Sequence, residues 1–225
     1  TQYFGTGKDS GGNFFVQRMF LLFNTGGTIV DGSTINATVD TKLSWFKTAS
    51  AVLNGDNDAD DFITVGQCRP ASDSTLATAD YDQVVPIVPS TGVAHTEGID
   101  AGARLDFGSI TTSTTHAQVL NATGRAAIAT ATQTLPSGAP SAGRSRFLLA
   151  EGHDVKDLAY AGATGTSNQI EIALADNGAN KPEMSVDWTA PAAPALSWHP
   201  IFPDVLLDPG LDVVASGQLA PKRET

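Results

Sequence analysis

The sequence predicts an all-β fold, a sandwich of two antiparallel sheets with short helices in its loops. Turn residues recur at regular spacing between short apolar or alternating segments, and no segment carries a long helical repeat. Charged residues make up only 16% of the chain, against ~25% in ordinary globular proteins. Thr, Ser, Gly and Ala take their place, and Thr favours strands while Gly favours turns. Hydrophobic residues reach 41% of the 225 residues, which is enough for a core within one large domain.

The first segments predict an extended chain. Residues 1–13 are polar and rich in glycine, which favours an N-terminal arm or an edge strand. Residues 14–23 are apolar almost throughout, so we expect a strand buried on both faces or covered by a partner. Asn24-Thr25-Gly26-Gly27 should end that strand as a turn.

The next part of the chain predicts a hairpin. Residues 35–46 alternate between apolar and polar with one slip of phase, which indicates one long strand with a bulge. Residues 54–57 (Asn-Gly-Asp-Asn) form a strong turn signal, and residues 62–68 alternate again as the returning strand. A short helix is expected from Ser72 to Tyr81. Residues 84–102 are punctuated by proline and glycine and predict a loop.

Short strands dominate the remainder of the predicted sandwich. A second short helix is expected over 126–131, capped by Asn121 or Thr123, and a loop over 134–144. The strands that complete a set of about eight are expected at 104–110, 116–120, 146–150, 169–174 and 184–188.

The composition changes at Thr189. Six of the 12 prolines lie in 191–225, which excludes long strands or helices there. The same tail is too apolar for a solvated linker, so it must lie on a surface, either that of its own sandwich or that of a neighbouring subunit. We therefore expect an N-terminal arm or edge strand over 1–13, a sandwich over 14–188 and an irregular Pro-rich C-terminal arm over 189–225. The arm residues predicted to bind a partner are Trp198, Ile201, Phe202, Val205, Leu206, Leu207 and Leu211.

Charge and cysteine content exclude several classes of protein. Thirteen basic residues against 24 acidic ones give a net charge of -11. Such a surface repels phosphate, so we expect no nucleic-acid partner and no membrane partner. The strongest apolar run, Met19–Phe23, is far too short to span a bilayer. Cys68 is the single cysteine, so the chain forms no intramolecular disulfide and no multi-cysteine metal cage.

Two acidic segments are candidates for a cation. Asp56, Asp58 and Asp60 alternate as in a calcium loop, but Asp61 and Gln67 stand where an EF-hand needs Gly and Glu. An acidic hairpin tip is therefore favoured over calcium, and no other cofactor is expected. The second segment could hold a hard metal or simply hydrogen-bond a turn; it comprises Glu151, His153, Asp154 and Asp157. The four histidines show no zinc-ligand spacing.

No catalytic motif supports an enzyme. The sequence has no Gly-x-Ser-x-Gly, no P-loop and no dinucleotide fingerprint. The segment Thr25–Ile29 resembles the nucleophile segment of asparaginases, but the second Thr-Asp-Lys cluster and the α/β pattern of those enzymes are missing. Trp45 and Trp188 lie in strand patterns, so we expect them in the core rather than stacked on sugars.

Several segments resemble a known family in their order along the chain. The strand Arg18-x-Phe20-Leu21-x-Phe23-Asn24-Thr25 precedes Ile35-Asn36-Ala37-Thr38-Val39. Further on come Pro70-Ala71-Ser72-Asp73-Ser74, Asp80-Tyr81-Asp82, Leu120-Asn121-Ala122-Thr123-Gly124-Arg125 and Glu151-Gly152-His153-Asp154. Over roughly residues 13–188 the chain resembles the DNRLRE-type modules. These are jelly rolls, similar to carbohydrate-binding modules, and occur in bacterial surface proteins and in structural proteins of tailed phages.

The resemblance implies a jelly-roll sandwich and no catalytic residue. The family usually opens with an extra strand, for which only 1–13 is available here, and the tail 189–225 lies outside the module. We expect a non-enzymatic structural or attachment subunit on the outside of a phage particle, as capsid decoration or tail-associated protein. Its partners would be copies of itself or capsid or tail proteins, at the virion surface or outside the cell. The alternative is a glycan-binding module of a secreted enzyme or adhesin, with a host-surface glycan as ligand.

Overall fold

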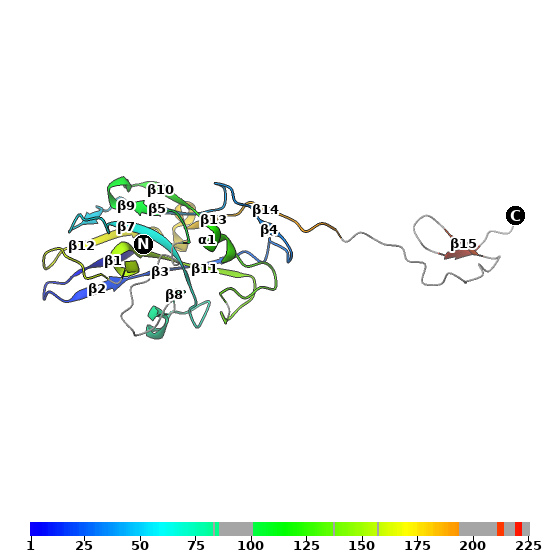
Figure 1. Cartoon of the computed structure of the whole chain (residues 1–225), viewed down its shortest axis with the longest axis horizontal. Helices are drawn as coiled ribbons and strands as arrows, with labels where there is room; N and C mark the ends of the chain where they lie inside the picture. The colour runs from blue at the N-terminus through cyan, green and yellow to red at the C-terminus, as the bar shows by residue number, and fades with distance from the viewer. Residues whose placement is uncertain are drawn as a thin grey trace. The chain divides into compact units, whose positions relative to one another are not determined.

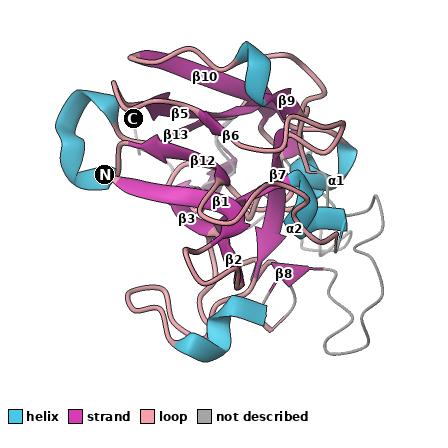
Figure 2. Ribbon diagram, turned by 90° about the vertical axis from the view of Figure 1, so that its left-hand side faces the viewer, coloured by secondary structure: helices cyan, strands magenta, loops and turns pink. Residues whose placement is uncertain are grey.

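Two antiparallel sheets face each other in the computed structural model (Figures 1 and 2). The structure describes residues 1–82, 84–85, 101–136, 138–156, 158–193, 211–213 and 219–221. The first sheet has the order β10 (Thr114–Val119), β5 (Lys42–Lys47), β12 (Ser167–Ile172), β1 (Gln2–Lys8) and β2 (Phe14–Gln17); β13 (Glu183–Ser185) pairs with β5 and β6 (Leu53–Asn54) with β12. The second has the order β3 (Met19–Asn24), β11 (Arg144–Glu151), β7 (Phe62–Cys68) and β8 (Val84–Val85), with β9 (Leu105–Asp106) beside β7.

Short helices and two small strand pairs complete the described chain. β4 (Thr34–Ile35) pairs with β14 (Trp188–Thr189). The helices are η1 (Thr78–Asp82), η3 (Phe107–Ser109), α1 (Ala122–Ala126), α2 (Gly152–Lys156) and η4 (Ala175–Asn180). Within the described ranges, no helix has the length and apolar character needed to cross a membrane. The all-β prediction with short helices is therefore confirmed.

The chain divides into two compact units, Thr1–Pro191 and Ala192–Thr225. The first contains both sheets. The second contains the antiparallel pair β15 (Leu211–Val213) and β16 (Leu219–Pro221).

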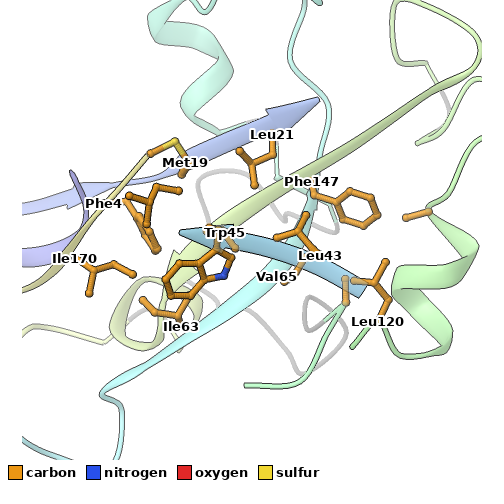
Figure 3. Close-up of a cluster of buried hydrophobic side chains, with 14 of the residues drawn as sticks. Phe4, Met19, Leu21, Leu43, Trp45, Ile63, Val65, Leu120, Phe147 and Ile170 are labelled. Atoms are coloured by element: carbon orange, nitrogen blue, oxygen red, sulfur yellow. The ribbon is translucent and has the colours of Figure 1, made fainter. Parts of the chain in front are cut away.

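The main core lies between the two sheets and draws side chains from both. Phe4, Trp45 and Ile170 come from the first sheet, and Ile63 and Phe147 from the second; all five are fully buried (Figure 3). The predicted core position of Trp45 is thereby confirmed, and Trp188 packs against the same cluster, partly buried. Burying one such large side chain contributes about 1.5–3 kcal/mol.

The second sheet is covered on its outer face as well. Cys68, Leu148, Ala150 and Val155 form a second buried cluster there, with Phe20 packed against it. For this reason β7 and β11 are buried along nearly their whole length, although β11 also carries the polar residues Arg146 and Glu151.

The apolar run 14–23 does not form one strand buried on both faces. β2 belongs to the first sheet and β3 to the second, and Arg18 lies at the corner between them. In β3, Met19 and Leu21 enter the core while Leu22 is exposed. The second half of the run is apolar because β3 packs on both faces, with Met19 and Leu21 in the core and Phe20 against the outer cluster. The turn that was expected to follow it is confirmed at 26–28.

The Gly-rich segment at the start of the chain is an inner strand and neither an arm nor an edge. β1 lies between β12 and β2 and pairs with both. Its Phe4 and Thr6 are fully buried. Gly5 adopts φ 141°, and a Cβ there would overlap the carbonyl of Asn168 on β12. Glycine therefore permits a close approach of two strands in a segment whose composition predicted an arm or an edge strand.

The predicted long strand and hairpin of the next segment are wrong. β4 and β5 are separated by a turn, in which the Thr41 amide donates to the Thr38 carbonyl at 3.3 Å. β5 and β7 lie in opposite sheets, so the turn at 54–57 belongs to a connection that crosses between sheets. That crossing brings an acidic loop to the end of the sandwich.

The helices are shorter than predicted. Only η1 forms within the helix expected from Ser72 to Tyr81. The second helix, α1, begins earlier than the predicted 126–131, directly after Asn121, whose side chain accepts the Gly124 amide at 3.0 Å. Strands overlap each of the predicted ranges 62–68, 104–110, 116–120, 146–150, 169–174 and 184–188, but in 104–110 only β9 is strand and η3 follows it. Of the loop expected over 84–102, residues 86–100 are outside the described residues.

Candidate functional site

A group of acidic side chains surrounds one histidine where the loop after β6 meets α2. Asp56, Asp58, Asp61 and His153 each offer one ligand-type atom, and these atoms all lie within 4.8 Å of one another. We call these four residues the Asp–His cluster. The three aspartates precede β7, and His153 is the second residue of α2.

Two glycines allow the segments of the cluster to approach. A Cβ on Gly55 would overlap the Tyr160 hydroxyl, and one on Gly152 would overlap the Asp60 carbonyl. Lys156 of α2 forms an ion pair with Asp60, which ties the helix to the same loop. The acidic loop is therefore pressed against α2 and the segment before β12, and larger residues at these glycines would separate them.

His153 lies between carboxylates on both sides of its ring. Nδ1 contacts Glu151 Oε1 at 2.9 Å, while Nε2 lies 3.2 Å from Asp56 Oδ2 and 3.4 Å from Asp58 Oδ2. The residue is 2% exposed. The hydrogen bond that His153 donates to Glu151, aided by the charges of Glu151, Asp56 and Asp58, raises the pKa of His153 to about 9. In this arrangement the imidazole therefore favours its protonated form at neutral pH.

Glu151 is the orienting partner of that imidazole. It ends β11, is 1% exposed, and accepts hydrogen bonds from Thr6 Oγ1 at 2.6 Å and from the His153 amide at 3.0 Å through its Oε2. Its other oxygen, Oε1, is the one that contacts the His153 ring. The carboxylate is thus held by groups from β1 and α2, and this fixes the orientation of the imidazole.

Asn168 of β12 fixes the orientation of two aspartates. Its Nδ2 donates to Asp56 Oδ1 and to Asp61 Oδ1, both at 2.6 Å, and its Oδ1 accepts the Gly55 amide at 2.9 Å. Asp61 is 7% exposed, and its Oδ2 is buried without a hydrogen-bond partner. Burial and the neighbouring Asp56 raise the pKa of Asp61 to about 6.

This arrangement suits cation binding better than catalysis. Carboxylate oxygens and one imidazole nitrogen are the ligands that divalent metals use in proteins. Asp58 is the most exposed member of the cluster, with 40% of its side chain accessible, whereas Asp56 and His153 are nearly inaccessible.

The structure joins the two acidic segments that the sequence had presented separately. Asp56 and Asp58 lie in the cluster, but Asp60 pairs with Lys156, and Asp61 takes the third carboxylate position. From the second segment, His153 is a member and Glu151 its partner. Asp154 instead pairs with Arg18 at 2.6 Å, and Asp157 lies outside the described residues.

The contributions of Asn168 and Thr6 were not found from the sequence. Each is a single polar residue in a strand, and neither carries a local motif. Only the pairing of β1 with β12 brings them to the cluster.

The arm residues predicted to bind a partner cannot be placed in the same way. Residues 198–207 lie outside the described part of the chain, and of that set Leu211 falls in β15.

Thr25 has a structural role in this fold. It is 8% exposed and lines a depression with Ile29 and Trp188. Its Oγ1 lies 2.7 Å from the Ala129 carbonyl, to which it donates, and 2.6 Å from Ser145 Oγ. The hydroxyl is thus engaged in bonds that join the turn to β11 and its neighbours.

Comparisons with known proteins leave the family of the chain open. The chain matches no protein-family model, no curated protein and no solved structure.

Proposed function

We propose that this chain is a non-enzymatic structural or attachment subunit: a jelly-roll sandwich that docks through a Pro-rich C-terminal arm. The resemblance to DNRLRE-type modules supports a place on the outside of a phage particle, as capsid decoration or in the tail. Its partners would be copies of the same chain or capsid or tail proteins. The virion surface is the location that follows from this proposal.

The core of the sandwich carries the proposal. All core residues that the structure describes lie between Phe4 and Trp188, from both sheets. The unit Ala192–Thr225 is separate from Thr1–Pro191. A core built between the two sheets of Thr1–Pro191 supports the proposal that the apolar residues of the arm bind another surface. Burial of Trp198 and Phe202 there would contribute about 1.5–3 kcal/mol each.

The second candidate is glycan binding, and the distribution of aromatic residues argues against it. A sugar platform needs exposed, coplanar aromatic rings. Tyr3 and Phe14 are exposed, at 40% and 47%, on the paired strands β1 and β2. Phe14 pairs with Lys8, and Lys8 is five residues from Tyr3, so alternation places the two rings on opposite faces of the sheet. These two residues therefore do not form one platform.

The size of the full chain in solution tests the proposal. We expect the wild type to form assemblies in light scattering after gel filtration. Trp198→Ser together with Phe202→Ser should weaken assembly by about 100-fold or more and leave the melting temperature of the sandwich unchanged. The matched control is Val39→Ser with Leu76→Ser, two apolar side chains exposed on the sandwich at 70% and 61%. This control should assemble like the wild type.

Two outcomes contradict the proposal. If the arm variant melts several degrees lower, the arm is part of the core of its own sandwich. If the wild type is monomeric at every concentration and a glycan array gives a specific ligand, the glycan-binding alternative replaces it.

A further inference from the structure

We propose that the Asp–His cluster binds one divalent transition-metal ion, Zn²⁺ or Mn²⁺, through Asp56, Asp58, Asp61 and His153. The ion would join the loop after β6 to α2 and so close one end of the sandwich. This proposal does not depend on the C-terminal arm. It also differs from the calcium site considered from the sequence, both in the ligand set and in the kind of ion.

The separations of the ligand atoms fit one small ion. Nε2 of His153 lies 3.2 Å from Asp56 Oδ2 and 3.4 Å from Asp58 Oδ2. Four ligands placed tetrahedrally at 2.0–2.1 Å from Zn²⁺ would be separated by about 3.3 Å. The two separations from His153 Nε2 match this value, and all four ligand atoms lie within 4.8 Å of one another.

The imidazole decides between classes of ion. Ca²⁺ prefers six to eight oxygen ligands, whereas imidazole nitrogen suits Zn²⁺ and other transition metals. His153 also has the partner that a metal-bound histidine needs, since Glu151 Oε1 lies 2.9 Å from Nδ1. Metal binding would release the proton of Nε2, which lies next to Asp56 and Asp58, while the proton on Nδ1 stays held by the Glu151 carboxylate.

The carboxylate oxygens of Asp56 and Asp61 are also arranged to bind a cation. Asn168 occupies the Oδ1 atoms of Asp56 and Asp61. This leaves Asp61 Oδ2 buried and without any hydrogen-bond partner. Buried carboxylate oxygens are rarely left unpaired, because the desolvation cost is high. A bound cation supplies the missing partner.

Charge balance supports the same conclusion. The four residues and Glu151 bring four carboxylates together, and His153 is the single member of this set that can be positive. A divalent cation would compensate the excess negative charge, which is unfavourable in a buried site.

Metal binding by the full chain tests the inference. Protein stripped with EDTA should take up about one equivalent of Zn²⁺ or Mn²⁺ in calorimetric titration, retain it through gel filtration, and melt several degrees higher. Asp61→Asn should bind at least about 100-fold more weakly, since it loses a charged ligand. Without metal it should melt at or above the wild type, because the unpaired buried charge is gone.

Matched variants separate this site from surface binding. Asp60→Asn removes a neighbouring aspartate that pairs with Lys156, and His116→Asn removes a histidine on β10; both should retain the metal. His153→Asn should lose the metal. If His153→Asn does not fold, the metal affinity of Asp61→Asn tests the site. The inference is overturned if only Ca²⁺ binds, if no ion binds, or if Asp61→Asn binds as the wild type does.

Discussion

Arg18 and Asp154 form a two-point ion pair between segments 136 residues apart. Arg18 Nε donates to Asp154 Oδ2 at 2.8 Å, and Nη2 donates to Oδ1 at 2.6 Å. Only 7% and 6% of the two side chains are accessible. The pair ties the corner between β2 and β3, where the chain changes sheets, to the helix that carries His153.

Breaking this pair should be costly. Arg18→Met leaves the Asp154 carboxylate buried without its cation, and Asp154→Asn removes the negative charge that the Arg18 guanidinium contacts. We expect each change to lower the free energy of unfolding by about 3–5 kcal/mol. Urea denaturation of both single variants and the double variant measures this. The double variant should lose much less than the sum, and a strictly additive loss would contradict direct coupling.

Much of the sheet structure was predictable because its signals are local. The alternation in 62–68 and the apolar run 146–150 each specify a strand without help from the rest of the chain. What could not be predicted was which sheet each strand joins. The run 14–23 has no turn residue at Arg18, yet the chain changes sheets there, because Asp154 provides a distant partner for the corner.

The Asp–His cluster also could not be predicted from local signals in the sequence. Ligand-spacing rules work when the ligands lie in one loop or one helix. Here Asp61 and His153 are separated by 92 positions, so no local pattern in the sequence joins their two segments. The alternation of Asp56, Asp58 and Asp60 suggested the wrong third carboxylate, because Asp60 is directed to Lys156 instead.

Because β1 lies inside the first sheet, we expect a phenylalanine on it to contribute more to stability than one on the edge strand β2. Phe4 on β1 is fully buried, whereas Phe14 on the neighbouring β2 is 47% exposed. Phe4→Ala should destabilise the protein by about 3–5 kcal/mol, because it leaves a cavity between the sheets. Phe14→Ala, the matched control, should cost much less. Chemical denaturation compares them, and equal small effects would mean that the first strand is a dispensable arm.

Asp80 should make stability depend on pH in the acid range. Its carboxylate accepts the Ala71 amide at 2.6 Å and the Ala77 amide at 2.7 Å, and these bonds hold its pKa below the ordinary value. The lowered pKa means that this contribution to stability is complete above the pKa of the unfolded chain, about 3.9. It is lost as the pH falls through the lower pKa of the folded state.

The variant Asp80→Asn tests that dependence. It should be less stable than the wild type at pH 7, and the difference should narrow at and below about pH 4. Urea midpoints across this range provide the measurement. Asp176→Asn, at an exposed position in η4, is the control and should leave the pH profile unchanged. A difference that stays constant down to pH 2 would show that the charge of Asp80 does not contribute.

Cys68 provides a direct probe of how firmly β7 and β11 are held. The thiol is 1% exposed, its Sγ donates to the Phe147 carbonyl at 3.2 Å, and burial raises its pKa. Because the thiolate is the reactive form, native protein should resist alkylation, and labelling should proceed only through opening of the second sheet. Mass spectrometry after timed exposure to iodoacetamide, with and without urea, measures this on the chain's single cysteine.

Leu148→Ala in the adjacent cluster should speed native labelling in proportion to its loss of stability, whereas Val39→Ala on the surface should not. Rapid labelling of the native wild type would mean that the outer cover of the second sheet opens far more easily than its buried side chains indicate.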